Sequence, residues 1–550
     1  MNIKKEVQDF WNGCVELTRS LLRSTELKQV LLWCIPALIV GFALRAVLLV
    51  QMPYGFIQYD TPDFLTTPYQ FLAKHHLVIH GKKSFLTPVF FLLPFILHIP
   101  ALIFIPLAQN IMGLLGVVLA GGLVRLWFKQ WRWFIVPVTV LIAGNPFAIW
   151  YEKTLMGEAN FLFFALLLAV FGTLWAKNPC KQTFVLLLLG LFLNAGTRGE
   201  AKLYFAFGLA LIPLVLWRQW GSILLHWAIT LVVMVGTFHI SETSHAPSLL
   251  YATLVHLTPD HLRFEPDIAP YVLPLRDRYR QEWVERQGEL VQVAKVINRA
   301  IEPYVKEHYP AKHGKRNREM AADVFQRLCL DVLVSNPVGV ALVPFGKFQQ
   351  ATDGWSSGVF DEGYLDRHQK NAATRGKWMT QVLSKGLTGT QMDDMEMKSF
   401  IDAHYDPKRI QWFADYQKAW NFGMIALRLP DRPMIKKRWV HDYVPGVPGG
   451  LATNPGMPFF YILAFAGMLA MMLRSGQLRE AQVAWILATL FVWWSATLVG
   501  VTNARFRFVY EPQCILFIFA LIDCLWDWAS RLVGSKAPKE TKETVECTTS

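Results

Sequence analysis

Long apolar stretches dominate this 550-residue chain, many of them roughly 18 to 25 residues in length. A helix of about 20 apolar residues is long enough to cross the hydrocarbon core of a bilayer. In lipid, only helices and closed barrels satisfy their own backbone groups, and these stretches are too long and uniform for barrel strands. The sequence therefore predicts an all-α polytopic membrane protein with about ten transmembrane helices. The predicted spans are 29–50, 101–124, 133–150, 158–176, 183–196, 203–217, 222–240, 456–473, 481–500 and 513–530.

One further apolar run, from Phe85 to Pro100, is shorter and is interrupted by Pro88, Pro94 and His98. Such a run is more often re-entrant or interfacial than membrane-spanning. Counting it as a span would also break the agreement between the charge distribution and the rest of the topology. We therefore expect this run not to cross the membrane.

Basic residues are divided unevenly between the two predicted sides of the membrane. With a cytoplasmic N-terminus, the inside segments carry about twice as many Lys and Arg residues as the short outside loops. The formal net charge of +13 follows from this bias. Because the basic residues lie in short loops rather than in one patch, a nucleic-acid partner is disfavoured. We expect a multi-pass protein of the plasma membrane, the bacterial inner membrane, with both termini in the cytoplasm.

A large charged segment, 241–455, separates the seventh predicted span from the eighth. Helical periodicity around 279–308, 316–334 and 391–428 predicts that this exoplasmic insert is mainly helical. Its basic residues do not argue against an outside location, since long domains translocate largely regardless of charge. The predicted organisation is a cytoplasmic segment 1–28, a transmembrane module 29–240, the insert 241–455, C-terminal transmembrane helices 456–533 and a cytoplasmic tail 534–550.

The cysteines and histidines give no sign of a metal site. The seven cysteines are scattered, without a disulfide framework or metal-ligand spacing. His75, His76 and His80 share one loop, but their spacing matches no metal motif, and surface or hydrogen-bonded histidines are the simpler expectation. We therefore expect no metal and no cofactor.

Several polar clusters fall on the predicted exoplasmic face, where they oppose the general charge bias. Ionisable groups at membrane depth are costly and tend to be functional. Acids and bases that converge at one interface indicate a site for a charged reaction with a phosphate ligand. The clusters are 59–63 after the first span, 152–153 and 156–158 before the fourth, 197–202 between the fifth and sixth, and 503–507 before the last.

The acids in these clusters differ in how much local structure explains them. Thr61 and Asp63 fit the start of a helix, Thr as N-cap and Asp in the first turn. Asp60 lies outside that helix and is not needed for the cap, so we take it as a functional residue. Glu158 opens the fourth span, where an acid complements the helix dipole, and sequence alone leaves its role open. Glu200 has capping-box spacing from Thr197 and is best explained as structural.

The cations are candidates for binding phosphate. Arg198 adds positive charge to a helix N-terminus that already attracts anions, and Lys202 lies one turn further along the same predicted helix. Arg505 and Arg507 either bind the same phosphate or anchor the last span by reaching to lipid headgroups. Arg45, inside the first span, either pairs with an acid or reaches to the interface, and it is left unassigned.

At these residues the sequence resembles the GT-C superfamily of membrane glycosyltransferases, which includes the protein O-mannosyltransferase and aminoarabinose-transferase families. Those enzymes carry an essential acid after the first span, in a pattern similar to D-[ST]-x-x-[YF]-L. The matching segments are Asp60-Thr61-Pro62-Asp63-Phe64-Leu65, Gly81-Lys82-Lys83, Thr87-Pro88, Asn145-Pro146, Gly157-Glu158, Thr197-Arg198-Gly199-Glu200 and Arg505-Phe506-Arg507. The family often has a basic residue directly before the Thr-Pro step, where this chain has Leu86, so Lys82 or Lys83 would have to supply that contact. The position of the insert also departs from the family.

The resemblance implies a GT-C-like fold and a hexosyl- or pentosyltransferase of the cell envelope. The donor would be a polyprenyl-phosphate-linked sugar, and the acceptor a hydroxyl of a lipid, glycan or protein. Asp60 would act as general base, Glu158 would orient the acceptor or the base, and Arg198, Lys202, Arg505 and Arg507 would bind the donor phosphate. Alternatives are a lipid-linked glycan ligase or polymerase, a transporter, and a non-catalytic membrane protein.

Overall fold

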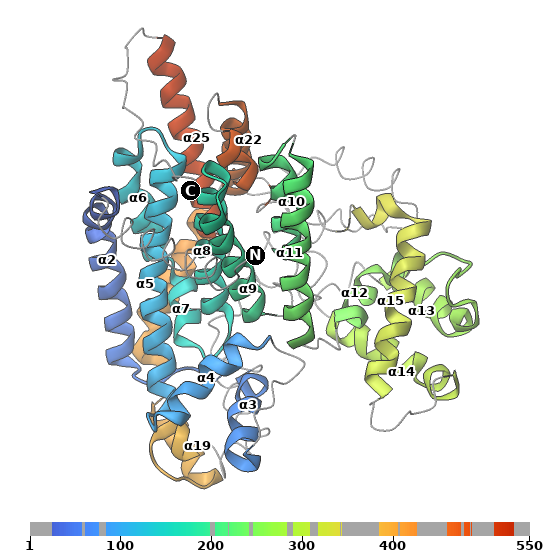
Figure 1. Cartoon of the computed structure of the whole chain (residues 1–550). Helices are drawn as coiled ribbons and strands as arrows, with labels where there is room; N and C mark the ends of the chain where they lie inside the picture. The colour runs from blue at the N-terminus through green and yellow to red at the C-terminus, as the bar shows by residue number, and fades with distance from the viewer. Residues whose placement is uncertain are drawn as a thin grey trace, which may run out of the picture.

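The chain is almost wholly helical in the part that the structure describes. The computed structural model describes residues 25–57, 61–75, 84–198, 204–217, 219–240, 246–282, 290–308, 317–341, 343, 384–404, 407–425, 459–474, 478–484, 486 and 511–532. Within these ranges β-pairing is limited to an isolated parallel bridge between Phe56 and Thr154. The remaining elements are helices that lie side by side in a bundle, with a separate helical group beyond α11 (Figure 1).

Five described helices are long and apolar enough to cross a membrane. They are α2 (Thr25–Gln51), α5 (Ala101–Trp127), α8 (Glu158–Lys177), α11 (Trp220–Ile240) and α25 (Glu511–Leu532). Shorter apolar helices are α4 (Leu86–Ile96), α9 (Lys181–Thr197), α10 (Phe205–Val215) and α22 (Phe459–Leu473). The chain is therefore a multi-pass membrane protein. Each predicted span overlaps one described helix, with two exceptions. The span 133–150 overlaps two helices, and most of 481–500 lies outside the described residues, so the count of ten stays a prediction.

The ambiguous run before α5 forms α4, which has only 11 residues. A helix of that length is roughly 16 Å long, about half the thickness of the hydrocarbon core. It ends at Ile96, and His98 follows with a positive φ of 55°. The segment is too short to cross, as the prolines in the sequence indicate.

The bundle helices carry apolar side chains on both sides. On α2, Cys34, Ala37 and Leu48 are buried against α5 and α6, whereas Leu32 and Phe42 on the opposite side are exposed. A helix that exposes large apolar side chains along its length is suited to contact with lipid. Figure 1 places α2 at the edge of the bundle, which agrees with this division.

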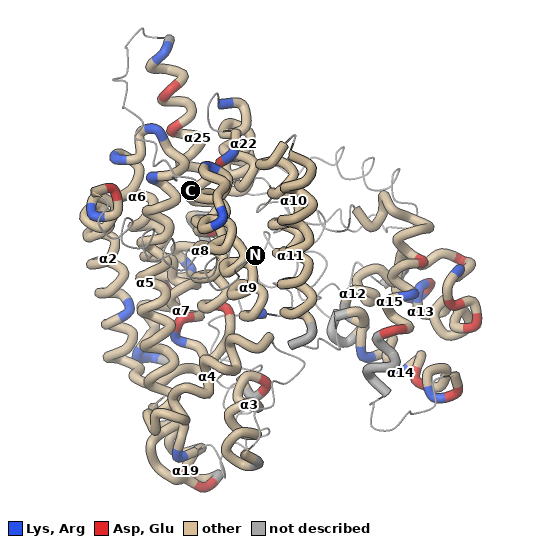
Figure 2. The backbone as a smooth tube through the Cα atoms, in the orientation of Figure 1, with Lys and Arg blue, Asp and Glu red and all other residues tan. Residues whose placement is uncertain are grey.

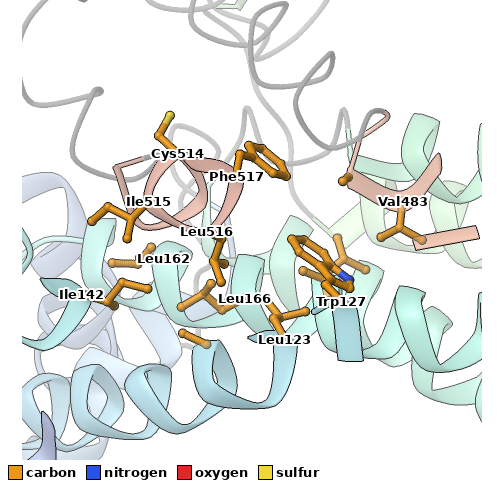
Figure 3. Packing of buried hydrophobic residues seen from close by; sticks show 14 of the residues in the cluster. Leu123, Trp127, Ile142, Leu162, Leu166, Val483, Cys514, Ile515, Leu516 and Phe517 are labelled. Carbon is orange, nitrogen blue, oxygen red and sulfur yellow. The ribbon is translucent and has the colours of Figure 1, made fainter. Parts of the chain in front are cut away.

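Close helix contacts in the core depend on small residues and aromatic pairs. Trp127 on α5 and Phe517 on α25 stack with 6.0 Å between ring centroids and an interplanar angle of 4° (Figure 3). On α22, a Cβ added to Gly467 would lie 1.8 Å from the carbonyl oxygen of Phe517. Membrane helices associate through van der Waals packing, so a glycine here allows two backbones to approach.

Many of the charged residues lie toward the two ends of the bundle (Figure 2). At one end, Arg125 pairs with Glu26 at 2.6 Å and Lys177 pairs with Glu480 at 3.0 Å. The other end holds Glu158, the first residue of α8, of which Lys177 is the last. A helix of 20 residues is about 30 Å long, so the two charged regions are separated by one hydrocarbon thickness.

The predicted span 133–150 is not one straight helix, and this corrects the prediction. The structure has α6 (Trp131–Ala143) and α7 (Pro146–Lys153), bent by 47° at the break. Asn145 caps α7, because its side-chain oxygen accepts from the backbone N–H groups of Phe147 and Ala148. Pro146 follows at the first helical position. Proline has no backbone N–H, but an N–H at this position would have no acceptor within the helix, so nothing is lost. A cap and a proline in sequence end one helix and start another.

The first part of the predicted insert folds around its own core. It comprises α12 (Ala246–Leu254), α13 (Ala269–Glu282), α14 (Leu290–His308) and α15 (Asn317–Ser335), with the short turns η2 (Val255–Leu257) and η3 (Pro266–Ile268). Tyr251, Ile297 and Phe325 lie in its buried centre. The expected helix over 279–308 is divided between α13 and α14.

A buried acid holds the loop of this part in place. The Glu265 carboxylate accepts from Tyr304 at 2.9 Å and pairs with Arg327 at 2.5 Å. The Asp331 carboxylate accepts the backbone N–H groups of Arg263 and Phe264. These acids are explained by structure and need no catalytic role.

The second part of the insert packs into the membrane bundle. It comprises α19 (Asp394–His404), η4 (Pro407–Ile410) and α20 (Gln411–Ile425). Ile410 and Phe413 belong to the same buried cluster as the bundle helices. The indole N–H of Trp412 donates to Gln51 Oε1 at 2.6 Å. The segment 241–455, expected as one soluble insert, therefore contains two parts with different partners.

Candidate functional site

Several of the predicted polar clusters meet at the end of the bundle where α8 begins. The chain leaving α2 runs beside the connection between α7 and α8, since Phe56 N donates to the carbonyl of Lys153 and Leu155 N donates to the carbonyl of Phe56. Next along the chain is α3 (Thr61–Lys74). The hydroxyl of Thr61 donates to the carbonyl of Leu155 at 3.1 Å. The loop after the first span is thus tied to the connection that precedes Glu158.

A second link joins the start of α4 to the end of α9. The hydroxyl of Thr87 donates to the carbonyl of Thr197 at 3.0 Å, and both side chains are buried. Gly157 packs against the same point, where an added Cβ would lie 3.2 Å from Thr87 Oγ1 and 3.3 Å from Phe64 Cζ. The Thr-Pro step, the Gly-Glu pair and the Thr-Arg turn therefore occupy one region.

At the centre of this region, Arg198 Nη1 lies 2.8 Å from Glu158 Oε1. The relative exposure is 11% for the arginine side chain and 1% for the glutamate. Glu158 is the first residue of α8 and Arg198 directly follows the last residue of α9. A charge-assisted hydrogen bond of this kind, shielded from water, is stronger than a surface ion pair. Two residues chosen from sequence as parts of one site are thus in direct contact.

The other predicted site residues lie outside the described residues. These are Asp60, Lys202, Arg505 and Arg507, together with Lys82 and Lys83. Asp60 directly precedes Thr61, and Lys202 lies four residues beyond Arg198. Their roles therefore stay predictions.

A second ion pair, deeper in the bundle, was only partly anticipated. Arg45 on α2 donates two hydrogen bonds to the Glu152 carboxylate on α7, at 2.6 and 2.7 Å. It also donates to the carbonyls of Gly41 and Ala143. The carboxylate lies against Gly113 on α5, where a Cβ would be 2.0 Å from Glu152 Oε1. Both charged side chains are almost fully buried, so they pair rather than reach toward the interface.

Glu511, the first residue of α25, was missed by sequence reasoning. Its Oε2 accepts from Asn145 Nδ2 at 2.7 Å and from Trp420 Nε1 at 3.2 Å. The signal that singled out Glu158, an acid opening an apolar span, was also present at Glu511. The contact joins the cap of α7 to the last span and to α20.

Lys153 is a further buried charged residue in this region. Its side chain is 1% exposed, and within the described residues its Nζ has no hydrogen-bond partner. No group of three His, Cys, Asp or Glu side chains suited to a metal ion occurs among the residues that the structure describes.

Comparison with known proteins gives little further information. No protein-family model matches the chain, and no curated protein matches it. Among solved structures, the chain is similar to the crystal structure of ArnT from Cupriavidus metallidurans bound to undecaprenyl phosphate. The sequence identity is 13% and the TM-score is 0.29, with 93% of this chain and 81% of that chain covered. Because these values are too low to transfer a function, the function is inferred below from the residues of this chain.

Proposed function

We propose that the chain is a membrane glycosyltransferase that moves a sugar from a polyprenyl-phosphate donor to an acceptor hydroxyl on the exoplasmic face. The observation that carries the proposal is the buried Glu158–Arg198 ion pair, where the Thr-Pro, Gly-Glu and Thr-Arg segments meet. Along the chain, the segment that contains Asp60 comes first and these three segments follow it. This is the order that the sequence resemblance implies. Their spatial convergence supports a single site.

The proposed reaction is a single displacement with inversion at the anomeric carbon. Asp60 takes the proton of the acceptor hydroxyl as the hydroxyl oxygen forms a bond to that carbon. The bond from the anomeric carbon to the phosphate oxygen breaks, and the polyprenyl phosphate leaves with the electron pair. A positioned base contributes about 10²- to 10⁴-fold to such a step.

The leaving phosphate needs positive charge more than it needs a proton. Arg198, Lys202, Arg505 and Arg507 are the proposed cations. Glu158 holds the Arg198 guanidinium at the start of α8, so we assign Glu158 a positioning role in the resting site. The apolar helices around the site give the polyprenyl chain a place beside the bundle.

A variant of Asp60 tests this proposal. Asp60→Asn should abolish transfer, measured by mass analysis of the products that purified protein in lipid nanodiscs makes from polyprenyl-phosphate sugars. Asp63→Asn is the matched control, because Asp63 lies in the first turn of α3 and is explained by the helix dipole. Turnover near the wild-type level in Asp60→Asn would refute the assignment of the base.

A further inference from the structure

Near the candidate site, one buried cation lacks an ion pair within the described residues. The carboxylate of Glu152 is compensated by Arg45, and that of Glu158 by Arg198. Lys153 lies between these two acids in the sequence and has no acceptor among the described residues. Lys153 is therefore a buried cation that no ion pair within the described residues compensates.

Lys153 lies close to the candidate site. Its carbonyl accepts from the backbone N–H of Phe56, which precedes Asp60 by four positions in the sequence. Glu158 follows it by five residues, so the two Cα atoms are at most about 18 Å apart even in a fully extended connection. The lysine thus belongs to the same end of the bundle as the Glu158–Arg198 pair.

Two ordinary roles of a lysine do not fit this position. A lysine that reaches to the interface keeps its ammonium group in water, but this side chain is 1% exposed. A structural buried lysine is paired with an acid or with carbonyl groups. An ammonium group with no acceptor in a buried place is costly, and an anion that enters the site removes that cost.

We propose that Lys153 binds the anionic phosphate group of the lipid substrate. This inference deepens the proposed function, because it names the residue that distinguishes a phosphorylated polyprenyl lipid from an uncharged one. A lysine ammonium binds phosphate as a compact point charge. In the resting protein Arg198 is already paired with Glu158, whereas Lys153 has no such pair to break in the part of the chain that the structure describes.

The test compares wild type, Lys153→Met and Lys177→Met in nanodiscs. Methionine keeps the length of the side chain and removes its charge. Lys177 is the control, since it pairs with Glu480 at the far end of α8. The probes are a short-chain polyprenyl phosphate and the corresponding polyprenol, with affinities measured by native mass spectrometry and melting temperatures by differential scanning fluorimetry.

We expect Lys153→Met to weaken binding of polyprenyl phosphate by roughly 10- to 100-fold, the loss of a charge-assisted contact. Binding of polyprenol and the melting temperature without ligand should not fall. Lys177→Met should bind both probes as wild type does. Unchanged affinity for polyprenyl phosphate in Lys153→Met, or a lower melting temperature with unchanged affinity, would show a structural role and overturn the inference.

Two further comparisons separate the possible failures. Competition by phosphatidylglycerol that is as strong as that by polyprenyl phosphate would overturn the lipid substrate as the source of the phosphate. If Asp60→Asn is active and Lys153→Met no longer binds polyprenyl phosphate, the assignment of Asp60 as the base is wrong and the assignment of Lys153 as the phosphate-binding residue is supported. If Asp60→Asn is inactive and Lys153→Met binds polyprenyl phosphate normally, the proposed reaction is supported and the proposed role of Lys153 is wrong.

Discussion

Arg198, directly after α9, donates a hydrogen bond to Glu158, the first residue of α8, across 2.8 Å. The pair connects two helix ends that are 40 positions apart in the sequence. An acid at a helix N-terminus is favoured by the helix dipole, and the hydrogen bond from Arg198 holds the guanidinium beside the Glu158 carboxylate. The guanidinium is therefore positioned before any substrate arrives.

This pair can be tested by removing each partner. We expect Arg198→Met to lower the rate of transfer by about 10²- to 10³-fold, comparable to the loss of one preorganised donor to a developing charge. Glu158→Gln keeps an oxygen that can accept a hydrogen bond from Arg198, so this variant should lower the rate of transfer by a smaller factor. Initial-rate measurements at saturating donor would show this order. Equal rates in wild type and Arg198→Met would remove Arg198 from the catalytic site.

The Arg45–Glu152 pair should behave as a buried ion pair. Arg45→Met leaves the Glu152 carboxylate without its guanidinium and should cost about 3–5 kcal/mol of stability. The double variant Arg45→Met, Glu152→Met should regain much of that loss, because no uncompensated charge remains. Thermal unfolding of the four proteins in one detergent provides the cycle. Additive effects of the two substitutions would contradict the pairing.

The contact between α22 and α25 predicts a steric effect at one glycine. Gly467→Ala should destabilise the protein by about 1–3 kcal/mol, because its new Cβ would overlap the backbone of Phe517. Gly122→Ala on α5 is the matched control, since an added Cβ there meets no atom within 4 Å. That variant should be neutral or more stable, given the helix propensity of alanine. Melting temperatures would compare the two, and equal values would contradict the close approach.

The pKa of the Cys329 thiol is raised to about 12 by burial in the first part of the insert. At pH 8 the folded protein should therefore contain roughly a thousandfold less thiolate at this position than the unfolded chain, and react correspondingly slowly with maleimide. Because the folded thiol holds its proton more tightly, this contribution to stability is complete below the unfolded pKa of about 8.5 and is lost as pH rises toward 12. Peptide mass spectrometry after labelling with and without urea measures the difference. Similar labelling rates with and without urea would contradict the burial of the Cys329 thiol in the folded protein.

Much of the helix arrangement could be predicted from the sequence because the length of apolar runs is a local property. The starts and ends of α2, α8 and α9 follow from where charged residues interrupt these runs. That Glu158 and Arg198 lie in one region was expected, because both lie at ends of spans on one predicted face, but their direct pairing was not predicted. Topology alone brings such residues near one another.

Other features depend on partners that are distant in sequence. Arg45 and Glu152 are 107 positions apart, and nothing local indicates whether an arginine in a span pairs or reaches to the interface. The break after α6 was visible in the sequence as Asn145-Pro146, but a bend could not be separated from a turn outside the membrane. The packing of α20 against the bundle was also hidden, since an amphipathic helix does not specify its partner.

The break between α6 and α7 has a consequence for the rest of the chain. Helix ends leave carbonyl groups without partners inside the helix, and within a bilayer no water replaces them. Arg45 supplies a donor to Ala143, and the Tyr416 hydroxyl on α20 supplies one to Gly144. Part of what looks like an extramembrane appendage thus completes the backbone of a transmembrane element. Excising residues 241–455 to isolate a minimal membrane module would remove that donor, so the insert and the bundle have to be expressed together.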